Sequence, residues 1–253
     1  MSEQKNLPIP LKYRPLKFSE LIGQDLMSQT IQKAIETDRV ANAYLLTGVR
    51  GVGKTTTSVN LATALAACGR KVLLIDFDPQ GNASTGLGIA DREFNSYRLV
   101  TLGCTARKAM QSTLVPRLDI IPAVVDLSAA EVELTDMERR EYQLAEGING
   151  ICVDYQYVII DCPPSLSLLT VMALVCSHSL LVPLQTEFFA LEGLTQLMKT
   201  IERIKVSLNP DLSIRGILLT MYDKRNKLSS QVEKEARDYF NEKVYLTVIP
   251  RNV

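Results

Sequence analysis

The chain has 253 residues, 46% of them hydrophobic, which is enough for one large domain or two small ones with a substantial core. Lys plus Arg and Asp plus Glu number 28 each, so overall charge does not force a nucleic-acid or membrane partner. The five cysteines form no C-x-x-C pair, which is typical of reduced thiols in a cytoplasm. Because no apolar run of about eighteen residues occurs and the start is polar, we expect a soluble protein without a signal peptide.

Patterns typical of strands and helices alternate along the chain. Residues 1–42 predict a lead-in with three prolines followed by an apolar helix face over 27–35. Later patterns predict strands at 43–47, 72–75, 118–121, 157–160, 179–182, 214–220 and 244–249. They predict helices at 56–67, 106–111, 128 to beyond 141, 168–175, 191–208 and 228–240. Most strands are apolar without alternation, so we expect a doubly wound α/β domain over 43–253, with a mostly parallel sheet and helices on both faces.

A glycine-rich segment follows the first predicted strand. Residues 48–55 read G-V-R-G-V-G-K-T and fit the pattern G-x-x-x-x-G-K-[ST]. In this pattern backbone N–H groups turn onto a phosphate, Lys54 adds a positive charge and the Thr55 hydroxyl can ligate Mg²⁺. The predicted helix after it places the loop at a helix N-terminus, where the dipole favours anions. The sequence therefore predicts a P-loop nucleotide-binding protein rather than a glycine-rich turn without a ligand.

Three aspartates follow apolar strands. Asp76 and Asp78 come after the strand at 72–75, and Asp161 comes after the strand at 157–160. Ligands of parallel sheets bind at the carboxyl ends of the strands, where a carboxylate can hold Mg²⁺ or its waters or orient an attacking water. A single aspartate there would more often cap a helix or turn, but three beside a phosphate loop favour a functional role.

Five longer segments carry a family resemblance. They are K-V-L-L-I-D-F-D-P-Q-G-N-A-S at 71–84, V-I-I-D-C-P-P-S at 158–165, V-P-L-Q-T-E-F-F-A-L-E-G at 182–193, L-T-M-Y-D at 219–223 and V-I-P-R-N-V at 248–253. From Gly51 to Val253 the chain resembles the ParA/Soj family of chromosome- and plasmid-partitioning ATPases. The resemblance implies a cytoplasmic, nucleoid-associated bacterial protein. It also implies an ATP-dependent homodimer that binds DNA nonspecifically and that a ParB-like, partition-site-binding protein stimulates to hydrolyse ATP.

The resemblance and the strand-end argument together imply a set of site residues. Lys54 would contact the β- and γ-phosphates, Asp78 would position the hydrolytic water and Asp161 would hold a water of Mg²⁺, so these three are the expected catalytic residues. Magnesium contacts are expected from Thr55, Asp76 and Asp161. Nucleotide contacts are expected from Gly48, Gly51, Val52, Gly53, Lys54, Thr55, Thr56, Pro250 and Asn252, with Pro250 and its neighbours bordering the adenine.

A basic cluster follows the predicted strand at 214–220. It consists of Lys224, Arg225 and Lys227, near the expected carboxyl edge of the sheet. The residues alone leave a phosphate contact and a solvated loop about equally open. The family resemblance favours contact with DNA.

The chain departs from the family pattern in two places. The family's loop reads K-G-G-V-G-K-T, and its first lysine reaches the γ-phosphate across the dimer. In this chain Val49 stands at the position of that lysine, and Arg50 stands at the position of the glycine that follows it. The chain also stops at Asn252-Val253, where the family continues through another basic residue and further helix. We therefore expect a C-terminally truncated ATPase domain with impaired hydrolysis.

The N-terminal segments resemble a different protein. They are K-Y-R-P at 12–15, F-S-E-L-I-G-Q at 18–24 and A-Y-L-L-T-G-V-R-G-V-G-K-T-T at 43–56. They resemble the γ/τ subunit of the bacterial DNA polymerase III clamp loader, an AAA+ ATPase. Both families share G-V-G-K-T-T, so we interpret the chain as a chimera joined at its phosphate loop, whether by recombination, misassembled sequence or engineering.

The sequence alone also allows two alternative functions to be considered. A clamp-loader ATPase would need an Asp-Glu pair on its second acidic strand and a zinc-binding cysteine cluster, but Asp161 is followed by Cys162 and the cluster is missing. A nucleotide-binding module without useful turnover is the third hypothesis, because the junction falls within the phosphate loop.

Overall fold

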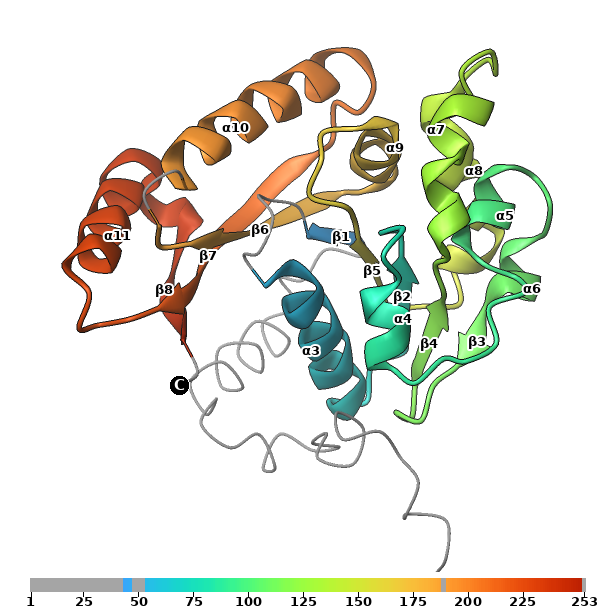
Figure 1. Cartoon of the computed structure of the whole chain (residues 1–253), viewed down its shortest axis with the longest axis horizontal. Helices are drawn as coiled ribbons and strands as arrows, with labels where there is room; N and C mark the ends of the chain where they lie inside the picture. Colours follow the sequence, from blue (N-terminus) through green and yellow to red (C-terminus); the bar gives the residue numbers. More distant parts are fainter. Residues whose placement is uncertain (1–42, 47–52, 188–189, 252–253) are drawn as a thin grey trace, which may run out of the picture.

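The computed structural model describes residues 43–46, 53–187 and 190–251 of the chain. The predicted helix at 27–35, the loop residues 48–52 and Asn252 lie outside the described residues. Within them, eight strands form one sheet in the order β3-β4-β2-β5-β1-β6-β7-β8 (Figure 1). The long crossovers that this order requires are the ones that the alternating strand and helix patterns predict.

The sheet is parallel apart from one pair of strands. The strands are β1 (Ala43–Leu46), β2 (Val72–Asp76), β3 (Gln111–Ser112), β4 (Leu118–Ile121), β5 (Tyr157–Asp161), β6 (Ser179–Gln185), β7 (Ser213–Tyr222) and β8 (Val244–Pro250). Only β3 and β4 pair antiparallel among these. Every residue of β2 and β5 is buried, as expected for central strands covered on both faces.

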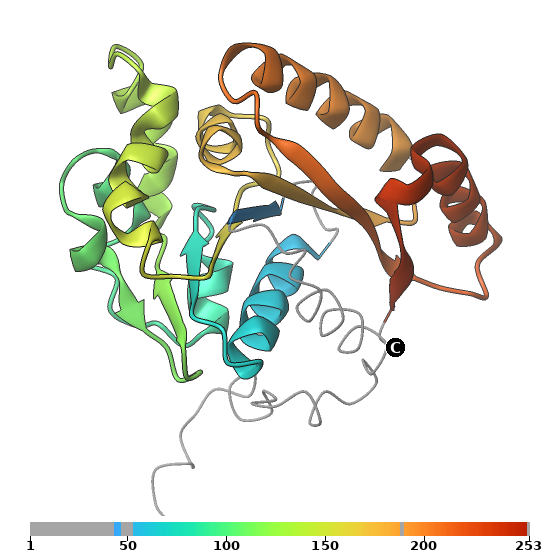
Figure 2. The ribbon, with the colours of Figure 1, turned by 180° about the vertical axis from the view of Figure 1, so that it is seen from behind.

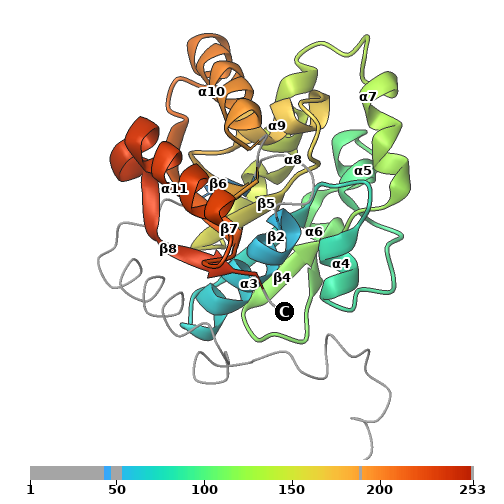
Figure 3. The same ribbon diagram turned by 60° about the vertical axis from the view of Figure 1, so that its left-hand side comes forward.

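Helices cover both faces of this sheet. They are α3 (Lys54–Ala67), α4 (Asn82–Gly86), α5 (Ser96–Val100), α6 (Ala106–Ala109), α7 (Ala130–Glu133), α8 (Gln143–Cys152), α9 (Leu168–Cys176), α10 (Ala190–Ser207) and α11 (Lys227–Phe240). Figures 2 and 3 show α8, α9 and α10 on one face and α3 on the other. The doubly wound α/β fold is confirmed.

Successive residues of one strand enter two different cores. Leu73 and Ile75 of β2 belong to the core beneath α8, α9 and α10, whereas Leu74 packs against α3. In β5, Ile160 belongs to the first core and Ile159 to the second. This alternation of side chains between faces explains why the strands are apolar at every position.

The helix predicted from Ser128 to beyond Glu141 is wrong. Ser128 does not cap a helix with its side chain but donates its hydroxyl to the carbonyl of Val125, 2.9 Å away. The chain forms only the short α7 there, and Arg139 has a φ of 57°, which no continuous helix allows. The sequence patterns also failed to predict α8, as well as α4, α5 and β3.

Strand β8 is the outer strand on one side of the sheet. The guanidinium of Arg237, on the adjacent helix α11, donates to the carbonyls of Val244 and Leu246, with both distances at 3.5 Å. Glu233 accepts from Arg237 Nε at 2.9 Å and fixes this orientation. Leu246 itself is 89% exposed.

Among the described residues, no helix is both long enough and apolar enough to span a membrane.

Candidate nucleotide-binding site

Helix α3 begins at the last glycine of the phosphate-binding pattern. Gly53 has a φ of 77°, a left-handed conformation that glycine adopts without strain. Its carbonyl accepts the backbone N–H and the hydroxyl of Thr57 at 2.9 and 2.8 Å, which closes the first turn. No side chain caps this N-terminus, so its N–H groups suit an anionic ligand. Lys54 and Thr55 are the first two residues of the helix, and Lys54 is only 7% exposed.

Two predicted carboxylates stand side by side at the carboxyl edge of the sheet. Asp76 ends β2, Asp161 ends β5, and the two residues are partners in the strand register. Both side chains are fully buried. Burial raises the pKa of Asp76 to about 6. Burial, reinforced by the neighbouring charge of Asp76, raises the pKa of Asp161 to about 7.

The hydrogen bonds of these two carboxylates differ. Both oxygens of Asp76 accept: Oδ2 from the backbone N–H and the hydroxyl of Ser84 at 2.7 and 2.6 Å, and Oδ1 from the N–H of Asp78 at 3.4 Å. In Asp161, Oδ1 accepts from the hydroxyl of Ser58 at 2.9 Å, but the buried Oδ2 has no hydrogen-bond partner among the described residues. An unpaired carboxylate oxygen in a buried site is costly unless a cation or a proton neutralises it.

The donor set fits a small divalent cation that also binds phosphate oxygens. Among the described residues, no group of three or more His, Cys, Asp and Glu side chains could hold a metal by itself. Mg²⁺ commonly takes one or two protein oxygens and completes its shell with water and substrate phosphates. The unpaired oxygen of Asp161 provides one such ligand, and the Thr55 hydroxyl, which acts to lower the pKa of Asp161 and so lies close to it, offers a second oxygen.

Asp78 lies in the turn between β2 and α4. Its carboxylate accepts the N–H of Gln80 at 3.0 Å, and its carbonyl accepts the N–H of Gly81 at 2.8 Å. Gly81 has a φ of 60° and is the N-cap residue directly before α4. The side chain of Asp78 is therefore held at the same edge of the sheet as Asp76, with 9% of the residue exposed.

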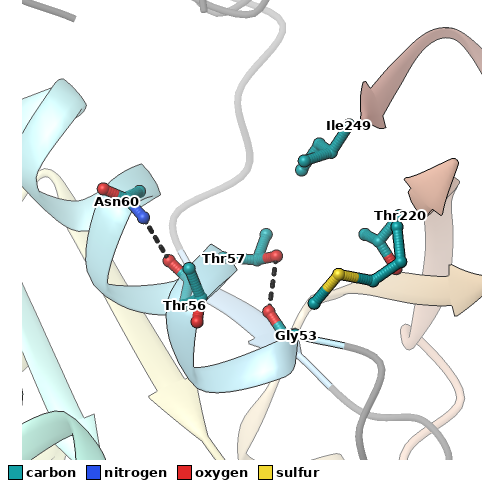
Figure 4. A pocket seen from close by; sticks show the side chains of 7 residues that line it. Gly53, Thr56, Thr57, Asn60, Thr220 and Ile249 are labelled. Carbon is teal, nitrogen blue, oxygen red and sulfur yellow. Dashed lines mark hydrogen bonds between the residues drawn. The ribbon is translucent and has the colours of Figure 1, made fainter. Parts of the chain in front are cut away.

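A pocket opens beside the start of α3. Its lining comes from α3, the end of β7 and the end of β8, namely Gly53, Thr56, Thr57, Asn60, Thr220, Met221 and Ile249 (Figure 4). Asn60 donates to the carbonyl of Thr56 at 2.8 Å, which orients its amide along the helix. Gly53 and Thr56 are predicted nucleotide contacts and Ile249 is a neighbour of Pro250, whereas Asn60 and Met221 are not among the predicted residues. Pro250 directly follows Ile249 but is not among the lining residues.

The predicted basic cluster is partly neutralised by its own loop. Arg225 pairs with Asp223 through Nε and Nη2 at 3.1 and 3.2 Å, and these bonds lower the pKa of Asp223. Lys224 and Lys227 are exposed, and Lys227 is the first residue of α11. The predicted contacts Gly48, Gly51, Val52 and Asn252 lie outside the described residues, as do Val49 and Arg50.

The fold and the site together define the class of protein. A parallel α/β sheet carries Gly-Lys-Thr at the start of a helix and buried carboxylates at the ends of two neighbouring strands. These are the features of a P-loop nucleoside triphosphatase. A family model described as an AAA domain matches residues 47–214 of the chain.

Curated relatives narrow the class to one family. The chromosome partitioning protein ParA of Caulobacter vibrioides is 56% identical over 207 residues, covering 80% of this chain and 78% of the relative. The sporulation initiation inhibitor protein Soj of Bacillus subtilis is 50% identical over 205 residues, covering 80% of this chain and 81% of the relative. The chain belongs to the ParA/Soj family of chromosome-partitioning ATPases.

Two solved structures are similar over 84% of the chain. The cobyrinic acid a,c-diamide synthase of Mycobacterium smegmatis, with bound ADP and magnesium, is 35% identical with a TM-score of 0.76, covering 84% of this chain and 88% of the other. A putative plasmid partition protein of Borrelia burgdorferi bound to AMPPNP is 26% identical with a TM-score of 0.71, covering 84% and 88%.

Proposed function

We propose that this chain binds ATP with Mg²⁺ and couples ATP hydrolysis to dimerisation and nonspecific DNA binding in partitioning, at the nucleoid in a bacterial cytoplasm. The observation that carries the proposal is the buried, unpartnered oxygen of Asp161 beside the start of α3, where Lys54 and Thr55 lie. The nucleotides bound to the M. smegmatis and B. burgdorferi proteins support it.

In this proposal, different residues bind the phosphates and the magnesium ion. Lys54 and the N–H groups at the start of α3 hold the β- and γ-phosphates. The Thr55 hydroxyl and Asp161 hold Mg²⁺, directly or through its waters, and Asp76 is the further magnesium contact that the sequence predicts. Because both oxygens of Asp76 already accept hydrogen bonds, its contacts favour a role in fixing Ser84 and α4. The bound cation supplies charge neutralisation on the phosphates.

Asp78 orients the attacking water. The turn that holds it, with bonds to Gln80 and Gly81, fixes its carboxylate before any ligand arrives. A positioned carboxylate lowers the barrier mainly by orientation, because phosphoryl transfer requires the incoming and leaving oxygens to lie in line.

The adenine occupies the pocket beside α3. Met221 and Ile249 give this pocket an apolar lining at the ends of β7 and β8. Pro250 and Asn252 border the base from the segment that follows, and Gly48, Gly51 and Val52 complete the phosphate loop.

Turnover by this chain is slow because Val49 stands where the family has its signature lysine. A cation delivered to the transferring phosphoryl group contributes ~10³–10⁵ in rate. At ~1.36 kcal/mol per decade, this is roughly 4–7 kcal/mol of transition-state stabilisation. Arg50 is the one nearby residue whose guanidinium is long enough to substitute. The double variant Val49→Lys/Arg50→Gly is expected to raise the rate. A high rate of the unmodified chain that disappears in Arg50→Ala would instead make Arg50 the substitute.

The partners follow from the family. We propose an ATP-dependent homodimer, a ParB-like protein that binds the partition site and stimulates hydrolysis, and DNA phosphates at Lys224, Arg225 and Lys227. The experiment that tests the function is the steady-state ATPase rate with and without nonspecific DNA. Slow ATP hydrolysis that responds to DNA supports a partitioning ATPase. ATP binding with no hydrolysis in either condition supports a nucleotide-binding module, the second candidate, which the valine at position 49 favours.

The first 42 residues are a separate lead-in to the ATPase domain of 43–253. The segments at 12–15 and 18–24 resemble the clamp-loader γ/τ subunit and support a chimeric chain joined at the phosphate loop. Limited proteolysis is expected to cut first between residues 15 and 42. Equal resistance along the whole chain would contradict this division, and a clamp-loader function would be supported only by clamp-dependent ATPase stimulation.

A further inference from the structure

The side chain of Arg92 ties together three segments around the turn that carries Asp78. Its Nη2 donates to the hydroxyl of Thr85 at 2.8 Å, and its Nε donates to the carbonyl of Ile89 at 3.1 Å. Its Nη1 lies 3.3 Å from the carbonyl of Ala123 and 3.5 Å from that of Gly81. These acceptors lie directly before α4 (Gly81), on α4 (Thr85), after α4 (Ile89) and after β4 (Ala123).

Gly81 leaves the space that this guanidinium occupies. A Cβ at position 81 would lie 2.6 Å from Nη1 of Arg92 and 3.1 Å from the carbonyl oxygen of Ala123. The positive φ of Gly81 also disfavours any side chain there. The last residue of the Asp78 turn and Arg92 are thus fitted to each other by both backbone conformation and packing.

Ser84 provides a second tie between the same segments. Its hydroxyl donates to Asp76 and accepts from the N–H of Ala123 at 3.0 Å, and the residue is fully buried. The turn at 77–81 is therefore fixed at one end by β2 and at the other by α4. Arg92 and Ser84 both join α4 to the segment after β4, and of the two it is Arg92 that reaches the carbonyl of Gly81, three residues from Asp78.

The four acceptors of Arg92 are all uncharged. No ion pair of Arg92 with an acidic side chain occurs among the residues that the structure describes. The planar fork of the guanidinium, with five donors in fixed directions, is what allows one side chain to reach acceptors on separate segments. A lysine at the same position has one terminal nitrogen and cannot bridge them.

We propose that Arg92 is a positioning residue for hydrolysis: it holds Gly81 and α4 against the end of β4 and so fixes the turn that presents Asp78. This role rests on the proposed function for its catalytic consequence, because only that function gives Asp78 a water to orient. The structural part, an ordered turn at 77–81 and helix α4 (together residues 77–86) that depend on Arg92, is independent of nucleotide.

The test compares Arg92→Ala and Arg92→Lys with Arg107→Ala. Arg107 is a matched control, since it is a surface arginine from the same part of the chain whose side chain is 64% exposed and forms an ion pair with Asp154. Amide hydrogen exchange is measured over 77–86 and over α3 in the nucleotide-free protein. Single-turnover hydrolysis and calorimetric affinity for Mg-ATP are measured on the same samples.

We expect both Arg92 variants to lose roughly tenfold or more of the protection of 77–86, with α3 unchanged. The single-turnover rate should fall roughly tenfold while the affinity for Mg-ATP stays within about twofold. Arg107→Ala should change neither. Unchanged protection at 77–86, or a fall in affinity as large as the fall in rate, would overturn the proposal. If the unmodified chain does not bind Mg-ATP, the proposed function fails, and the exchange result still decides the role of Arg92 in the turn.

Discussion

The ends of β2 and β5 lie side by side, yet they are built differently. The end of β2 is saturated with hydrogen bonds, because both carboxylate oxygens of Asp76 accept from Ser84 or Asp78. The end of β5 is incomplete, because one oxygen of Asp161 is buried without a partner among the described residues. The same residue type at registered positions therefore serves two purposes. Asp76 fixes Ser84 and α4, whereas Asp161 keeps one oxygen without a partner among the described residues, which is the oxygen that the proposed function assigns to Mg²⁺.

The largest effect is expected from a substitution in the proposed nucleotide site, at Lys54, the first residue of α3. The Lys54→Ala variant removes the cation at the start of α3, and we expect the affinity for Mg-ATP to fall by roughly a hundredfold, or about 3 kcal/mol. Calorimetry of both proteins measures the change. Lys227→Ala, outside the pocket, is the control and should bind as tightly as the unmodified chain. Retained affinity in Lys54→Ala would mean that the nucleotide binds elsewhere.

The structural side of the comparison is tested at Asp76. The Asp76→Ala variant leaves the buried N–H and hydroxyl of Ser84 without their acceptor. Each buried donor without an acceptor costs about 1–3 kcal/mol, so the loss of both bonds should lower the free energy of unfolding by at least about 2 kcal/mol in urea titrations. Ser84→Ala removes one of the two bonds and should cost less. A variant as stable as the unmodified chain would show that Asp76 does not organise α4.

Asp161 is expected to respond in the opposite direction. Its pKa is raised, so the folded state keeps a proton that the unfolded state releases at lower pH. The nucleotide-free protein should therefore lose stability as the pH rises from about 4 through about 7, and Asp161→Asn should remove part of this loss. At pH ~8 we expect the free energy of unfolding of that variant, measured by urea titration, to exceed that of the unmodified chain by on the order of 1–3 kcal/mol. It should also lose Mg²⁺-dependent nucleotide binding. If Asp161→Asn were less stable than the unmodified chain at this pH, the buried, ionised carboxylate of Asp161 would not be destabilising the folded state.

The smallest effect concerns DNA. Neutralising Lys224 and Lys227 should flatten the dependence of log affinity on log salt by roughly one unit for each DNA phosphate that these side chains neutralise. Arg225→Ala should change the slope less, because Asp223 already offsets that charge. Fluorescence anisotropy with a random duplex at several salt concentrations measures all three. An unchanged slope in the lysine variants would identify the cluster as a solvated loop.

The central sheet could be predicted from the sequence because a strand that is buried on both faces consists of consecutive apolar residues. Strands such as β2 and β5 must be apolar at every position, and the aspartate that ends each of them interrupts the run at the edge. The phosphate-binding pattern likewise marks the start of α3. These features depend on local residue order, so they are visible before folding.

The features that were missed depend on tertiary contacts. Helix α8 contains Gly147 and Gly150, which weaken the helical pattern; Gly147 lets the helix approach Leu99, since a Cβ there would lie 3.1 Å from that side chain. The short α4 follows from the bonds of Ser84 to Asp76, across eight residues. Met221 enters the pocket in a left-handed conformation, with a φ of 52°, which no residue pattern signals for methionine.

The coverage of β8 by Arg237 has a consequence for how copies of this chain can meet. An outer strand with unpaired carbonyls is a template on which a second chain can add a strand, and this route leads to open-ended fibres. Here the carbonyls of Val244 and Leu246 in this outer strand accept from the guanidinium of Arg237, which would have to be displaced before another chain could bind them. Growth through the sheet edge is thereby discouraged even though Leu246 is exposed beside it. At high protein concentration, strand addition at this edge would therefore first have to break the contacts of Arg237, which favours separate molecules over fused sheets.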